Sequence, residues 1–155
     1  MLRIPTQGRY ALRAMIDIGL HQDRGPVPRH DIARRQEFSA GYVAQIFHNL
    51  SLAKLVVGIK GPNGGYKLAK PCDEIRASDI LRATEGPFAL VQCVLEDDRT
   101  RCTRTETCAT HSLWVTLSHS IEAFLDSVTL KDLMNESPEL VPNHSLHRDL
   151  QDSAS

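Results

Sequence analysis

The 155 residues carry nearly balanced charge, with 18 basic and 19 acidic side chains, but the balance hides a strong asymmetry. Residues 1–70 hold eleven lysines and arginines against four acidic residues, whereas residues 71–155 hold seven against fifteen. The first half is therefore expected to attract a polyanion and the second half is not.

Several classes of protein are excluded by what the chain lacks. The sequence has no apolar run long enough to span a bilayer and no secretory-type apolar segment near its start. It also has no recognisable arrangement of nucleophile and base and no phosphate-binding glycine loop. We expect a soluble cytoplasmic protein that is not an enzyme and does not enter a membrane.

The first seventy residues predict a helix-turn-helix. Thr6 can cap a first helix whose apolar residues repeat at helical spacing: Ala11, Ala14, Met15 and Ile18. A short second helix is expected at about residues 29–35, with a break near Glu37. Ser39 is then a good N-cap for a third helix. Two short helices joined by a tight turn are the signature of the motif.

The third helix is expected to read DNA, and a hairpin wing follows it. Its core-facing residues repeat at helical spacing: Val43, Ile46, Phe47 and Leu50. Two β-prone runs, 55–59 and 66–68, flank the turn-rich stretch 60–65. Base and phosphate contacts are predicted for Arg9, Arg35, Ser39, Tyr42, Gln45, Asn49 and Lys60. Among them Gln45 can pair with adenine, and Lys60 can reach a minor groove or a phosphate.

The second half predicts a connecting helix, a loop and a long helix. The connecting helix stops at Gly86, and residues 89–107 form an aperiodic loop. A helix from about Cys108 to Val128 then carries a wide apolar stripe: Leu113, Trp114, Leu117, Ile121, Phe124, Leu125 and Val128. Too little chain remains to cover this stripe, so a second copy of the chain is expected to cover it in a homodimer.

A short helix capped by Thr129 follows and runs through Met134, and the polar tail 137–155 is expected to be mobile. The predicted organisation is a DNA-binding domain at 1–70, a sensor and dimerisation region at 71–136, and the tail at 137–155. The fold class is mainly α with a small β-hairpin.

Cys93, Cys102, Cys108 and His111 fall within nineteen residues. Because cytoplasmic thiols stay reduced, these cysteines are better metal ligands or redox groups than disulfides, whereas Cys72 stands apart as a spare thiol. A zinc site is one alternative, although zinc ligands usually come as two close couples and the gaps here are eight and five residues. Incidental small hydrophobic residues are another. Iron–sulfur ligation is favoured.

Four separated motifs resemble the IscR-like family of winged-helix regulators that respond to iron–sulfur status, redox state or nitric oxide. These are TQGRYA at 6–11, GPVP at 25–28, GPNGGY at 61–66 and CATHSLW at 108–114. The resemblance implies a homodimeric regulator holding a [2Fe-2S] cluster, or a [4Fe-4S] cluster, on Cys93, Cys102, Cys108 and His111. It also implies a cluster received from the iron–sulfur assembly machinery. Such regulators space their cysteines evenly at five residues, so the gap of eight is a departure.

The sequence therefore predicts a DNA-binding transcription regulator that senses through an iron–sulfur cluster. A zinc-stapled or metal-free winged-helix repressor is the first alternative. An electron-transfer iron–sulfur protein is the second, and it would have no need of the wing or the basic first half.

Overall fold

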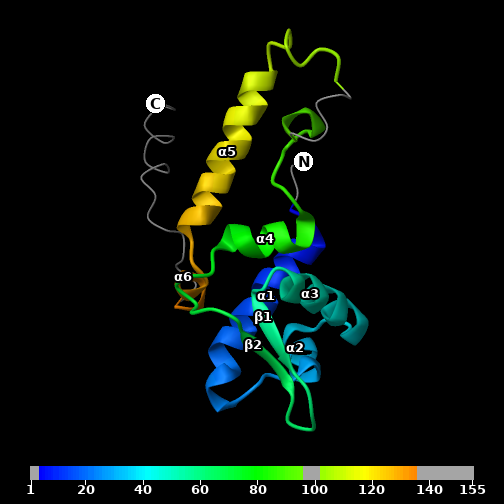
Figure 1. The fold of residues 1–155 in the computed structure, drawn as a ribbon, viewed down its shortest axis with the longest axis vertical. Coiled ribbons are helices and arrows are strands. Elements are labelled where there is room, and N and C mark those ends of the chain that lie inside the picture. Colours follow the sequence, from blue (N-terminus) through cyan, green and yellow to red (C-terminus); the bar gives the residue numbers. More distant parts are fainter. Residues whose placement is uncertain (1–3, 96–101, 136–155) are drawn as a thin grey trace, which may run out of the picture.

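The computed structural model describes residues 4–95 and 102–135, which form a small helical domain with a long helix standing away from it (Figure 1). The helices are α1 (Thr6–His21), α2 (Arg29–Gln36), α3 (Ala40–Leu52), α4 (Ala77–Glu85), α5 (His111–Ser127) and α6 (Leu130–Met134). Single turns of 3₁₀ helix lie at η1 (Gln22–Arg24) and η2 (Gln92–Val94), and a hairpin is formed by β1 (Val56–Ile59) and β2 (Gly65–Leu68). None of the described helices is long and apolar enough to cross a bilayer. The mainly helical fold with a β-hairpin wing is confirmed.

Helix α1 lies at the centre of the domain and packs against α2, α3, α4 and α6. The four apolar residues expected to face inward from α3, Val43, Ile46, Phe47 and Leu50, are completely buried. The turn between α2 and α3 also follows the prediction. Glu37 adopts a left-handed conformation with φ of 59°, and the Ser39 hydroxyl accepts the Tyr42 N–H at 3.3 Å.

The expected cap of α1 is wrong, because Thr6 is already helical and Pro5 precedes the helix. The N–H of Gly8 instead donates to the carboxylate of Glu85 in α4, at 2.6 Å. The free N–H groups of a first helical turn need an acceptor, and a carboxylate also complements the helix dipole. A residue 77 positions away in the chain therefore satisfies this end of α1.

The hairpin is fixed to the helical domain at its base. Strands β1 and β2 pair antiparallel, with Val56 opposite Leu68 and Ile59 opposite Gly65. The backbones of Val27 and Tyr66 exchange two hydrogen bonds of 2.9 Å each. A Cβ at Gly65 would lie 2.3 Å from the Val27 carbonyl oxygen, so glycine is required for this close approach.

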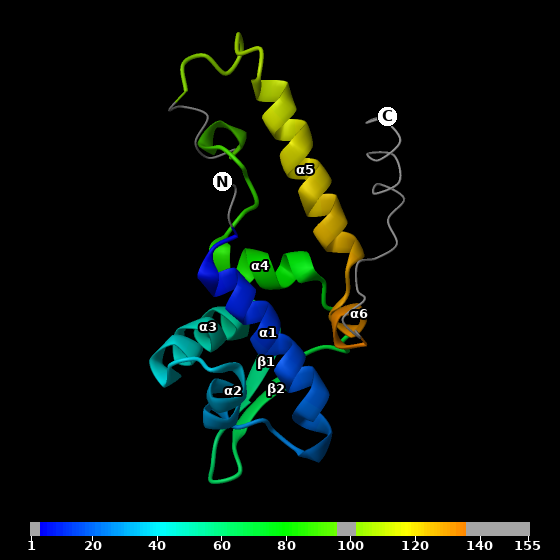
Figure 2. The same ribbon diagram turned by 180° about the vertical axis from the view of Figure 1, so that it is seen from behind.

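Helix α5 extends away from the domain and joins it mainly through α4 (Figures 1 and 2). The Ser78 hydroxyl of α4 donates to Asp126, and the Arg82 guanidinium binds Glu122 at 2.8 Å and Asp126 at 3.4 Å. Ser118 is the sole buried residue of α5 within the described chain. Much of the predicted apolar stripe is therefore open, with Leu113 56% exposed and Leu117 39% exposed.

Helix α4 ends at Gly86, whose φ is 83°, as predicted, and Thr129 caps α6 by accepting the Asp132 N–H at 3.0 Å. The predicted tail lies outside the described residues. The division of the chain at residues 70 and 136 stays a prediction.

Candidate functional site

The predicted reading helix presents a polar face. Ser39 and Gln45 are exposed, and Tyr42 and Asn49 are half-buried. Because the apolar residues of α3 hold its opposite side in the core, this face stays open. Arg9 on α1 is exposed and donates to the Thr6 hydroxyl oxygen at 3.3 Å, and Lys60 is exposed just past β1. All these residues stay predicted DNA contacts.

An aromatic cluster that the sequence pattern does not reveal holds the start of α3 against α1. Tyr10 stacks on Phe38 with ring centroids 4.2 Å apart, and its edge meets Tyr42 at 5.5 Å. The Arg13 guanidinium lies 4.8 Å from the centre of the Phe38 ring. Such contacts restrict the orientation of large side chains, so Tyr42 is held at the reading face by Tyr10 of α1, which is itself stacked on Phe38.

Arg35, a predicted phosphate contact, is engaged inside the domain. Its guanidinium donates to both carboxylate oxygens of Asp17 at 2.6–3.2 Å, and the Gln36 side-chain amide donates to the same carboxylate at 2.9 Å. Asp17 is 2% exposed. Burial by itself raises the pKa of Asp17, but the hydrogen bonds from Arg35 and Gln36 and the charge of Arg35 together outweigh burial, so the pKa lies below its ordinary value. The pair fixes α2 to α1.

The four predicted cluster ligands lie on or beside the loop that leads into α5. Cys93 is half-buried in η2, Cys102 is half-buried at the far end of the loop, and Cys108 is exposed. The expectation that Cys108 lies within the long helix is wrong, because α5 begins at His111. Cys108 is instead in the preceding turn, where its carbonyl oxygen accepts the His111 N–H at 3.2 Å. Threonine at 110 occupies the cap position that ends the turn.

The environment of two of these residues suits a metal. A cavity of about 480 Å³ is lined by Cys102, Thr103, Thr105, Glu106 and His111. The Nδ1 atom of His111 is buried and has no hydrogen-bond partner within the described chain. An unpaired buried imidazole nitrogen is costly, and metal ligation would satisfy it.

The thiol of Cys108 is also prepared for ligation. The hydroxyl of Thr110 lies 3.4 Å from its sulfur, and this hydroxyl together with the Thr110 backbone N–H lowers the pKa of the thiol. A lowered pKa favours the thiolate, which is the form that binds metal. The donor set of soft thiolates and one imidazole therefore fits an iron–sulfur group.

The structure does not gather all four ligands. Within residues 4–95 and 102–135, no three histidine, cysteine or acidic side chains lie close enough together to hold a metal ion. Cys93 is joined to Cys102 through residues 96–101, which lie outside the described chain. Cys72 is half-buried against the core and separate from the cavity, as expected of a spare thiol.

Comparison with known proteins gives a consistent result. A family model named Rrf2 and described as an iron-dependent transcriptional regulator matches residues 4–136. The HTH-type transcriptional regulator IscR of Serratia proteamaculans is 38% identical over 140 residues, covering 90% of this chain and 84% of that relative.

Two solved structures resemble the chain closely in fold. The structure of T. potens IscR has a TM-score of 0.69 and 34% identity, covering 86% of each chain. CymR (YrzC), the global cysteine regulator of B. subtilis, has a TM-score of 0.69 and 37% identity, covering 86% of this chain and 97% of its own. The helix-turn-helix, the wing and the family match over most of the chain together establish that it belongs to the Rrf2 family of transcriptional regulators and is not an enzyme.

Proposed function

We propose that this regulator binds operator DNA as a cytoplasmic homodimer and senses iron–sulfur status, redox state or nitric oxide through a cluster held by Cys93, Cys102, Cys108 and His111. The observation that carries the proposal is that His111, whose Nδ1 is buried without a hydrogen-bond partner in the described chain, lines the same cavity as Cys102. IscR-named relatives that match nine-tenths of the chain support it.

A [2Fe-2S] or [4Fe-4S] cluster, delivered by the iron–sulfur assembly machinery, would supply a redox-sensitive link between the loop and the start of α5. The chain's own residues prepare this link. The Thr110 hydroxyl favours the Cys108 thiolate, and the first turn of α5 orients His111. The N-terminal end of a helix also favours bound negative charge.

The sensor and the reading face are joined through α4. Ser78 and Arg82 hold α5, while α4 packs against both α1 and α3. A change in how the loop is held at His111 can therefore alter the angle of α5 and, through α4, the position of α3. A two-state coupling of this kind typically changes affinity about five- to 150-fold.

The homodimer rests on α5. Leu113 and Leu117 stay exposed on a helix that stands away from the domain (Figure 2). A second α5 packed along this side would remove both from water, at about 25 cal/mol per Å² of apolar surface.

The test compares the anaerobically purified protein with two matched variants, Cys102→Ser and Cys72→Ser. The wild type and Cys72→Ser are expected to be coloured and to contain iron and sulfide, while Cys102→Ser loses most of both. Gel-shift titration on a duplex that the wild type selects from a random pool should then give different affinities for the cluster-containing and the cluster-free protein. Equal iron content in the three proteins would overturn the ligand assignment.

The same experiment decides the alternatives. Colourless protein with bound zinc that still binds its duplex would indicate a zinc-stapled repressor. Protein that contains no metal and still binds its duplex would indicate a metal-free repressor. Coloured protein without any sequence-preferring DNA binding would favour electron transfer.

A further inference from the structure

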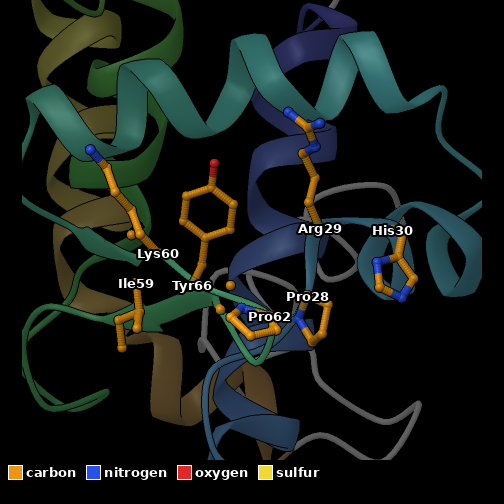
Figure 3. A pocket seen from close by; sticks show the side chains of 11 residues that line it. Pro28, Arg29, His30, Ile59, Lys60, Pro62 and Tyr66 are labelled. Atoms are coloured by element: carbon orange, nitrogen blue, oxygen red, sulfur yellow. The ribbon is translucent and has the colours of Figure 1, made fainter.

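A second cavity lies on the DNA-binding side of the domain, between the hairpin connection and the start of α2 (Figure 3). Its volume is about 500 Å³. Lys60 lines it from the hairpin, and Arg29 and His30 line it from α2. No acidic side chain is among its lining residues, and no carboxylate in the described chain forms an ion pair with Lys60 or Arg29. His30 lies 3.6 Å from the Asp31 carboxylate, so Lys60 and Arg29 are the two cations of the cavity that can bind an anion.

Tyr66 gives this cavity a rigid neutral donor. Its ring stacks on Phe47 of α3 with centroids 4.1 Å apart and planes 12° apart, and its backbone is bonded to Val27 on both sides. Its hydroxyl forms no hydrogen bond with any described residue. In Figure 3 the Tyr66 ring lies between Lys60 and Arg29, and the ends of the three side chains point the same way.

We infer that this cavity receives one phosphodiester group of the DNA backbone, bound by Lys60, Arg29 and the Tyr66 hydroxyl. A phosphate suits two cations and a neutral O–H donor, because its oxygens are acceptors with negative charge. The stacking on Phe47 and the backbone hydrogen bonds to Val27 restrict the Tyr66 ring, so the donor is in place before DNA arrives. Contacts of this kind fix the register of a protein on the duplex without reading its bases.

Arg29 and Tyr66 are therefore DNA contacts in addition to the residues predicted from the sequence. Arg29 begins α2, a helix from which Arg35 alone was predicted to contact DNA, and Tyr66 belongs to a hairpin motif noted for its turn residues. The inference rests on the proposed DNA binding and assigns a place on the protein to one phosphate.

The test measures binding of the full chain to two duplexes over a range of salt concentration. One duplex is selected by the wild type from a random pool, and the other is a scrambled sequence of equal composition. Arg29→Gln removes one cation, and Tyr66→Phe removes the hydroxyl while keeping the ring on Phe47. Lys131→Gln is the matched control, because it removes a cation from α6, which lies away from the hairpin (Figures 1 and 2).

Arg29→Gln should reduce the magnitude of the slope of log K against log salt by about 0.9, the loss expected for one phosphate contact. Tyr66→Phe should weaken binding about tenfold, as for a hydrogen bond to a charged group, and leave the slope unchanged. Both variants should weaken the two duplexes by the same factor, since phosphate contacts carry no base information.

If Arg29→Gln and Tyr66→Phe bind both duplexes with the affinity and salt slope of the wild type, the inference is overturned while the proposed function stays intact. Weakening confined to the selected duplex would also overturn it, because that result would mean base reading. A wild type that prefers no duplex would instead refute the proposed function.

Discussion

The ion pair between the buried Asp17 and the partly exposed Arg35 gives the sharpest prediction for stability. Replacing Asp17 by Asn keeps the side-chain shape but removes the charge that accepts three hydrogen bonds from Arg35 and one from Gln36. Breaking a buried pair from one side typically costs about 3–5 kcal/mol. The Arg35 side chain keeps 29% of its surface exposed and can regain water, so the lower end, about 3 kcal/mol, is expected.

Urea and thermal unfolding of the metal-free protein at a fixed protein concentration measure this loss. For a chain of this size about 3 kcal/mol corresponds to a fall of roughly 6–12 °C in Tm. Asp31→Asn is the matched control. It breaks a pair with Arg34, which is 75% exposed, and surface pairs contribute about 0–1 kcal/mol. A loss below about 1 kcal/mol for Asp17→Asn, or equal losses for both variants, would refute the reasoning.

The carboxylate of Asp17 also predicts how the stability of the protein depends on pH. Because the pKa of Asp17 is lower in the folded than in the unfolded chain, its contribution to stability is fully present above about pH 4. The contribution is lost as the pH falls through the folded pKa. The stability curve of Asp17→Asn should therefore approach that of the wild type in acid. Curves that stay parallel down to pH 2 would contradict the assignment.

Two further substitutions test packing and assembly. Gly8→Ala would place a Cβ 2.8 Å from the buried Leu81 side chain, so it should lower the free energy of unfolding in urea by about 1 kcal/mol. A Cβ at Gly41 has nothing within 4 Å, so Gly41→Ala should raise the free energy of unfolding by about 0.5–1 kcal/mol. Equal effects at both glycines would show that the contact with α4 is unimportant. Leu113→Glu should convert the dimer to monomer in analytical ultracentrifugation, and Leu20→Glu, at a similar exposure of 53%, should not; a dimeric Leu113→Glu would remove α5 from the interface.

The DNA-binding fold is predictable from the sequence because its signals are local. The apolar spacing from Val43 to Leu50, the cap at Ser39 and the glycines of the hairpin all act within a few residues of one another. The strands expected at 55–59 and 66–68 lie within one residue of β1 and β2, and Ser39 caps α3 as expected.

Contacts between distant segments could not be predicted. Nothing near Gly8 indicates that Glu85 accepts its N–H, and no periodicity marks Asp17 as the partner of Arg35. A polar residue within an apolar helix face has many possible partners until the fold brings one to it. The start of α5 was predicted at Cys108 and lies at His111. Cys108 and His111 have the spacing of neighbours on a helix, although the turn that joins them is not helical.

The sensor loop shows most clearly how far the sequence alone can predict a site. Its residue types predict the ligands, because thiols in a reducing compartment suit a soft metal. The aperiodic loop contains no local rule for arranging them, and the structure brings only Cys102 and His111 to one cavity. The geometry of such a site depends on the ligated group itself.

Mössbauer spectroscopy of ⁵⁷Fe-labelled protein, purified without air and compared with His111→Ala, tests the central claim most directly. The account predicts an iron–sulfur spectrum in the wild type whose parameters change when the imidazole is removed, because Nδ1 of His111 then no longer binds iron. Identical spectra, or wild-type protein without iron that still binds its duplex, would contradict it.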